Sequence, residues 1–183
     1  ASRKNAGADA WAGDSDVLDD IAKTEFVGYT DMKATAKVTA IVKDGARVEA
    51  VETGDDIVFT LDRTSFYAES GGQVGDTGVI TNDSCTIRVL DTTKNAAGVF
   101  IHKAVVEEGF LREGDTVEAV VDVERRRAIM RNHTAAHLLQ AALRSVLGDH
   151  VEQAGQLVNE NAVRFDFTHF SALTDEELLA VEN

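Results

Sequence analysis

Two histidines separated by three residues are the strongest candidates for chemistry in this chain. His133 and His137 lie in residues 125–147, a segment without Gly or Pro and rich in Ala, Leu and Arg, which predicts a helix. Residues four apart lie one above the other on a helix, and Zn²⁺ accepts neutral imidazole nitrogen at about 2.0–2.1 Å. The pair can therefore share one metal ion, although two ordinary histidines on a polar helix face would show the same spacing.

The expected helix has one polar and one apolar face. At about 100° per residue, His133 and His137 share a face with Gln140 and Arg144. The opposite face carries Ala135, Leu138, Leu139, Ala142 and Val146. We therefore expect the two imidazoles to point away from the main packing surface of the helix.

A second candidate is the glycine-rich segment 64–78, which contains Gly71, Gly72 and Gln73. Glycines let backbone N–H groups approach a ligand closely, and the glutamine amide can both donate and accept hydrogen bonds. A long connection that needs positive φ angles would have the same composition. No Lys-Ser/Thr pair follows the glycines, and they do not open a helix, so neither a Walker loop nor a dinucleotide-binding motif is present.

The elements that must position these residues change in type along the chain. Short strands are predicted over residues 35–42, 48–51, 57–61, 79–81, 86–90, 99–106 and 116–123. Asp44-Gly45 and Asn82-Asp83 are the expected hairpin turns. Many short strands at short spacing indicate a small β-barrel or sandwich.

The chain after the histidine helix alternates between strand and helix signals. Residues 148 and 149 end the helix, and Gln153 lies in the return segment that leads to a strand containing Val163, Phe165 and Phe167. Asp166 and His169 are expected to be solvated. Thr174 is the expected N-cap of a further helix. Together with the strands this predicts an α+β fold.

Composition limits the partners that this chain could bind over a broad surface. It has 183 residues, 44% hydrophobic and 27% charged, with a formal net charge of −14. Broad contact with nucleic acid depends on neutralising phosphates, so any RNA contact must be local. The one basic concentration is Arg125, Arg126, Arg127, Arg131 and Arg144, which a solvated helix terminus would also explain.

The sequence also bears on membrane and redox chemistry. No run approaches about 18 apolar residues and no charged-then-apolar leader opens the sequence, so we expect a soluble cytoplasmic protein without membrane contacts. Cys85 is the single cysteine and cannot form an internal disulfide. A small buried strand residue is the simplest interpretation of Cys85.

Three stretches resemble, in the same order, the editing domain of the bacterial alanyl-tRNA synthetases. They are Phe-Tyr-Ala-Glu-Ser-Gly-Gly-Gln within 64–78, Asn-His-Thr-Ala-Ala-His-Leu-Leu within 126–139, and Val-Arg-Phe-Asp-Phe-Thr-His-Phe within 159–170. The resemblance implies an antiparallel β-barrel subdomain over 25–124 and an incomplete α+β editing subdomain over 125–183. Residues 1–24 resemble the link from the preceding tRNA-recognition helices.

The same resemblance implies roles for particular residues. His133 and His137 match zinc ligands that act with a Cys and a His of a later C-x-x-x-H motif, which this sequence does not contain. Gln153 matches a glutamine that shapes the pocket, and we assign it a catalytic role. The expected substrate-binding residues are Gly71, Gly72, Gln73, Thr134 and Arg126. Ala136 stands where the family often has Thr, which removes a hydroxyl from that position.

The resemblance also implies a reaction. The complete enzymes attach alanine to tRNA-Ala with ATP and magnesium, used in a separate aminoacylation domain, while the editing domain hydrolyses serine or glycine wrongly esterified to that tRNA. The mischarged acceptor end would be the partner. With two ligands missing, we expect this chain alone to bind zinc weakly and to have little activity. A free-standing editing hydrolase and a non-catalytic RNA- or protein-docking barrel remain alternatives.

Overall fold

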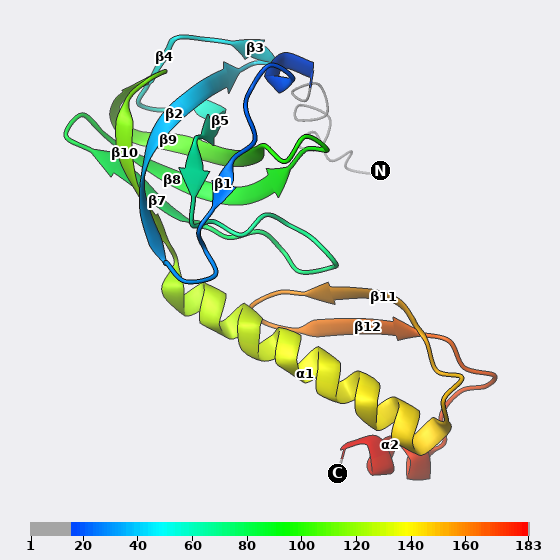
Figure 1. Ribbon diagram of the computed structural model, residues 1–183. Coiled ribbons are helices and arrows are strands. Elements are labelled where there is room, and N and C mark those ends of the chain that lie inside the picture. Colours follow the sequence, from blue (N-terminus) through cyan, green and yellow to red (C-terminus); the bar gives the residue numbers. More distant parts are fainter. Residues whose placement is uncertain (1–15, 183) are drawn as a thin grey trace, which may run out of the picture. The chain divides into compact units, whose positions relative to one another are not determined.

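The computed structural model describes residues 16–182, which form two compact units (Figure 1). The first unit comprises the described residues up to Glu69 and the segment Gly75–Val123. The second comprises Ser70–Val74 and the described residues from Glu124 onward. The glycine-rich loop thus contributes five residues to the unit that contains the histidine helix. Most of the predicted 1–24 link lies outside the described residues.

The first unit is a closed antiparallel barrel of six strands. In chain order they are β2 (Lys33–Lys43), β5 (Asp56–Leu61), β7 (Gly78–Asn82), β8 (Cys85–Lys94), β9 (Phe100–Arg112) and β10 (Thr116–Val121). Their order in the sheet is β10-β7-β8-β9-β5-β2, and pairing of β10 with β2 closes the ring. The structure therefore selects the barrel over the sandwich. Shorter elements are η1 (Asp16–Leu18), β1 (Glu25–Phe26), β3 (Ala46–Arg47), β4 (Ala50–Glu52) and β6 (Arg63–Thr64).

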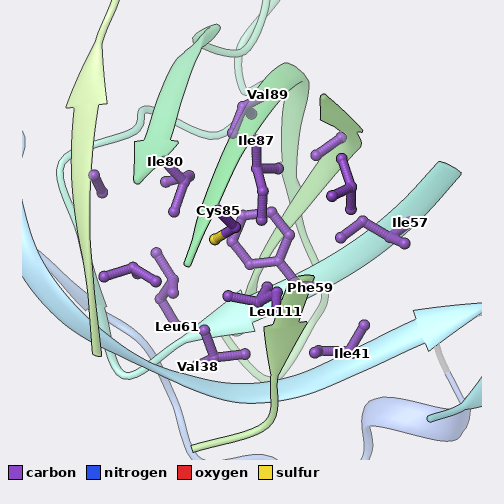
Figure 2. Close-up of a cluster of buried hydrophobic side chains, with 14 of the residues drawn as sticks. Val38, Ile41, Ile57, Phe59, Leu61, Ile80, Cys85, Ile87, Val89 and Leu111 are labelled. Atoms are coloured by element: carbon purple, nitrogen blue, oxygen red, sulfur yellow. The ribbon is translucent and has the colours of Figure 1, made fainter. Parts of the chain in front are cut away.

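The interior of the barrel is filled by alternate residues of its strands. In β10, Val117, Ala119 and Val121 are buried while the residues between them are exposed. Figure 2 shows the inward side chains gathered around Phe59, with Cys85 among them. The period of two that predicted the strands is therefore also the period that fills the core. Burial of Cys85 confirms its interpretation as a packed strand residue.

Two hairpin turns test the turn signals in the sequence. Asp44 and Gly45 both have positive φ, at 51° and 75°, between paired Lys43 and Ala46. Two successive positive φ angles match the right-handed twist of the flanking strands, which confirms the predicted turn. The second turn is displaced by one residue, because Asn82 pairs with Cys85 as the last strand residue. The side-chain oxygen of Asn82 accepts a hydrogen bond from the N–H of Ser84 at 2.8 Å.

The second unit combines helix α1 (Val123–Leu147) with a hairpin of β11 (Gln153–Val158) and β12 (Val163–Phe167), followed by α2 (Asp175–Glu182) (Figure 1). Ile129 and Ala136 of α1 pack with Val158 of β11. Val74 and Val163 join this small cluster. The cluster shows that the hairpin and the end of the glycine-rich loop cover one side of α1. No helix within residues 16–182 has the length and apolar character needed to span a membrane.

The buried face of α1 differs from the one that the sequence predicted. Leu138, expected in the packing stripe, is 67% exposed, whereas Ala136 is 2% exposed. His133 is half-buried and lies about 40° from Ile129 around the helix axis, beside the packed face rather than opposite it. The prediction that both imidazoles point away from the packing surface is therefore wrong for His133, whereas His137 is exposed. Apolar residues surround much of this Ala- and Leu-rich helix, so their number alone did not identify the covered face.

Candidate functional site

The loop Ser70–Val74 forms an edge of the second unit by pairing with β11. The N–H of Val158 donates to the carbonyl of Gly72 at 2.7 Å, and the N–H of Val74 donates to the carbonyl of Val158 at 3.1 Å. These bonds create a parallel bridge between Gln73 and Val158. Because β11 covers α1, this pairing fixes the backbone of Gln73 beside the helix that contains the histidines.

The two glycines permit the sharp reversal that presents Gln73. Ser70 and Gln73 exchange N–H···O bonds of 3.1 and 3.0 Å across Gly71 and Gly72, whose φ angles are 59° and 83°. A Cβ at position 72 would lie 2.4 Å from the carbonyl oxygen of Gln156. Positive φ angles, which the sequence left as the alternative to a binding role, are therefore present at both glycines. The close backbone approach at Gly72 is made to Gln156 of the same unit.

The side chain of Gln73 reaches the first histidine of the pair. Its Oε1 lies 2.5 Å from Nδ1 of His133, and the ring centroids of His133 and His137 are 4.9 Å apart with a tilt of 30°. An amide oxygen only accepts, so His133 donates through Nδ1–H and its Nε2 carries the free lone pair. The structure thus brings three residues predicted from the sequence into one cluster.

The cluster fits a metal ion as a source of two ligands. Two imidazoles one helical turn apart match half of a tetrahedral zinc site, and a hydrogen bond to the second ring nitrogen is the usual companion of a ligating histidine. Within residues 16–182 no group of three or more His, Cys, Asp or Glu side chains is arranged to hold a metal ion. Cys85 lies in the core of the barrel unit and is not a third ligand in this cluster.

Gln153 and Gln156 occupy different places on β11. Gln153 is exposed at the first position of the strand, opposite Phe167, whereas Val158, the partner of Gln73, is the last. Five residues of strand span about 16 Å. The structure therefore does not bring Gln153 to the contact between Gln73 and His133. Sequence reasoning missed Gln156, whose Nε2 donates to the carbonyl of Gly71 at 2.6 Å.

The signal that could have identified Gln156 was alternation along β11. Val158 is the buried apolar residue of this strand, and a residue two positions earlier lies on the same face. The family resemblance directed attention to Gln153 instead. Gln156 is therefore a residue found from the structure, while the role assigned to Gln153 stays a prediction.

The remaining predicted substrate residues have other contacts or positions. The hydroxyl of Thr134 donates to the carbonyl of Met130 at 3.1 Å, within its own helix. Arg126 is only 5% exposed, so its guanidinium is largely removed from solvent. Arg125 forms an ion pair of 3.2 Å with Glu160. Arg127 and Arg131 are the exposed cations in this half of α1.

A second group of rings lies near the ends of the hairpin. His150 Nε2 and His169 Nδ1 are 2.9 Å apart, and Phe170 stacks on His150 with a centroid distance of 4.6 Å. Asp166 accepts a hydrogen bond from Arg164 at 3.0 Å. The two residues that were expected to be solvated thus have separate partners, a histidine for His169 and an arginine for Asp166.

Comparisons with known proteins identify the family of this chain. The model of the family described as tRNA synthetases class II (A) matches residues 1–125. The alanine–tRNA ligase of Acetivibrio thermocellus is 52% identical over 175 residues, which are 95% of this chain and 20% of that protein. The alanine–tRNA ligase of Thermoanaerobacter pseudethanolicus is 51% identical over 161 residues, which are 88% of this chain and 18% of that protein.

A third relative gives the same result. The alanine–tRNA ligase of Synechococcus elongatus is 50% identical over 167 residues, 91% of this chain and 19% of that protein. The chain thus spans about a fifth of the length of the curated relatives it matches. Since the family model matches more than half of the chain, the chain belongs to the class II (A) tRNA synthetases, as a part of an alanine–tRNA ligase.

Proposed function

We propose that this chain is the part of an alanine–tRNA ligase that hydrolyses the ester between tRNA-Ala and a wrong amino acid, serine or glycine. The complete ligase would attach alanine to tRNA-Ala in the cytoplasm, with ATP and magnesium used in another domain. The observation that carries the proposal is the cluster of His133, His137 and Gln73 in one unit of a chain from this family.

A separate editing site is needed because the aminoacylation site of the ligase cannot discriminate serine and glycine from alanine well. Serine differs from alanine by one hydroxyl and glycine by one methyl, and an apolar pocket discriminates such differences by about 1–3 kcal/mol. A site with hydrogen-bonding groups for the serine hydroxyl favours the wrong product, because alanine leaves those groups unpaired.

The proposal gives each residue of the cluster a task. His133 and His137 would hold zinc, which when bound would polarise the ester, position the substrate or lower the pKa of a water molecule. Gly71 and Gly72 shape the turn beside the histidines, and the amide of Gln73 lies at its end. Outside the cluster, Gln153 keeps its predicted catalytic task, and Thr134 and Arg126 keep their predicted tasks as substrate-binding residues.

Histidine variants of the complete ligase test this function. We expect His133→Ala and His137→Ala each to lower hydrolysis of preformed Ser-tRNA-Ala by about 100-fold, because a lost ligand removes the metal-supported step, while attachment of alanine continues. The matched control is Leu138→Ala, which truncates an exposed side chain of the same helix. Undiminished serine ester hydrolysis in both histidine variants would exclude the histidine cluster from the hydrolysis and favour a docking role for this chain.

A glutamine variant tests the part assigned to Gln153. We expect Gln153→Ala to reduce hydrolysis of Ser-tRNA-Ala in the complete ligase, since an orienting amide would be lost. Gln153 is exposed, so the variant should unfold at the same temperature as the parent. An unchanged hydrolysis rate would remove Gln153 from the mechanism and leave the histidine cluster in place.

A further inference from the structure

The contact between Gln73 and His133 has a defined direction. Nδ1 of His133 faces Oε1 of Gln73 at 2.5 Å, and an amide oxygen has lone pairs but no proton to donate. A neutral imidazole has one N–H, which this contact requires at Nδ1. The lone pair is then at Nε2. The side chain of Gln73 therefore selects the tautomer in which Nε2 of His133 is the available ligand atom.

We propose that Gln73 is a positioning residue for His133, acting as a hydrogen-bond acceptor, and that Gln156 fixes the turn that presents Gln73. This inference deepens the proposed function. The orientation of His133 by Gln73 is argued from the observed contact, and only its effect on hydrolysis rests on the proposed function. It gives Gln73 a task toward the protein rather than the direct substrate contact expected from the sequence. It also assigns a task to Gln156, which no motif indicated.

The backbone and the side chain of Gln73 have separable tasks. The backbone is fixed by the bonds of Val158 to Gly72 and of Val74 to Val158, neither of which involves the Gln73 amide. Truncating the side chain therefore leaves the loop paired with β11. It removes only the acceptor for Nδ1–H of His133, and the ring can then rotate or change tautomer.

Gln156 acts on His133 indirectly, through the turn that presents Gln73. Its Nε2 donates to the carbonyl of Gly71 at 2.6 Å, and its own carbonyl and Cγ lie close to Gly72. Both glycines of the turn therefore contact one residue of β11. The turn ends at Gln73, so loss of the Gln156 amide frees the Gly71 carbonyl and loosens the position from which Gln73 reaches His133.

The experiment measures zinc affinity as well as catalysis in the complete ligase. The relevant zinc is the fraction that His133→Ala removes, and its affinity is determined by competition with a chelator. We expect Gln73→Ala to weaken this affinity by about 10–100-fold, the usual cost of losing a group that orients a metal ligand. We expect Gln73→Glu to retain it, because a carboxylate also accepts from Nδ1–H.

Two further variants complete the design. Gln156→Ala should weaken the same zinc affinity by less than Gln73→Ala, because the backbone pairing of the loop remains. The matched control is Asn161→Ala, which truncates an exposed amide in the turn of the same hairpin and should leave zinc affinity unchanged. With Ser-tRNA-Ala, the Gln73→Ala variant should lower kcat more than it raises KM.

Specific results would overturn the inference. Unchanged zinc affinity in Gln73→Ala together with a raised KM would make Gln73 a substrate-contact residue. Equal losses in Gln73→Ala and Gln73→Glu would mean that the amide donates rather than accepts. Absence of any His133-dependent zinc in the complete ligase would also overturn it. If zinc affinity responds as expected but the parent does not hydrolyse Ser-tRNA-Ala, the proposed function fails and the positioning task stands.

Discussion

Gln73 Oε1 lies 2.5 Å from His133 Nδ1, although 60 positions separate the two residues in the chain. The contact exists because residues 70–74 leave the barrel unit and pair with β11 of the second unit. The glycine-rich motif and the histidine motif are thus two parts of one cluster. The geometry of that cluster depends on the turn, on β11 and on the covered face of α1, and each of these can be tested separately.

The two glycines of the turn should differ in their tolerance of a side chain. Gly72→Ala places a Cβ 2.4 Å from a backbone oxygen at a φ of 83°, so the loop or β11 must shift, at a cost of about 1–3 kcal/mol of unfolding free energy. Gly71→Ala has no heavy atom within 4 Å of the new Cβ and a φ of 59°, and should cost about 1 kcal/mol. Urea unfolding of the two variants measures this difference, and equal losses would contradict the close approach at Gly72.

The orientation of α1 predicts opposite effects for two apolar residues. Ile129→Ala empties a fully buried position in the small cluster with Val158 and should lower the free energy of unfolding by about 2–4 kcal/mol. Leu138→Ala removes a side chain that is 67% exposed and should change it by less than about 0.5 kcal/mol. Denaturant unfolding followed by circular dichroism provides the comparison. A larger loss for Leu138→Ala would restore the helix face predicted from the sequence.

His102 makes the stability of the barrel dependent on pH. Burial lowers the pKa of His102 to about 4 from an ordinary value of 6.5. Its ring is stacked on Phe59, Nδ1–H donates to the Phe59 carbonyl at 3.2 Å, and Nε2 accepts from the hydroxyl of Thr64 at 3.0 Å. Because a carbonyl only accepts, this arrangement gives the neutral ring both of its hydrogen bonds, and a proton on Nε2 would require the Thr64 hydroxyl to turn its own proton away from the ring.

The sign of the pH effect follows from the lowered pKa. The unfolded chain binds a proton to His102 below about pH 6.5 while the folded chain does not, so stability is full above that value and is lost as pH falls toward 4, by about 2 kcal/mol at pH 5. Urea unfolding at pH 7 and pH 5 measures the loss. His102→Gln should reduce the difference between the two pH values, whatever its stability at pH 7. An equal pH difference in both proteins would exclude His102 as its source.

Thr174 and Glu177 form a capping box at the start of α2, and loss of this cap should destabilise that helix locally. The N–H of Glu177 donates to the Thr174 hydroxyl at 3.2 Å, and Glu177 Oε2 accepts from the N–H of Thr174 at 2.8 Å. No residue of α2 is buried, so these bonds carry much of its stability. Thr174→Ala should destabilise the helix by about 1 kcal/mol, seen as faster amide exchange over 175–182. Thr174→Ser should keep the slow exchange, and equal rates in both variants would argue against the cap.

Local patterns in the sequence were sufficient for several parts of the structure. Asp44-Gly45 adopts the predicted turn because both positions require positive φ, and Thr174 with Glu177 forms the predicted cap because the two side chains satisfy each other's backbone N–H groups. The strands around Val117 and Ala119 followed from alternation. Each of these depends on residues within a few positions of one another, whose geometry the backbone itself sets.

The candidate site could be predicted only in part from such local patterns. The sequence determined the helix, its histidine pair, the turn-forming glycines and the membership in a tRNA synthetase family, because these are recorded in residue types and short spacings. Only the tertiary structure decided that Ala136 rather than Leu138 is buried, that Gln73 reaches His133, and that Gln156 supports the turn. These relationships join segments that are distant in the chain, and which face of each segment is covered is decided by the partner that packs on it.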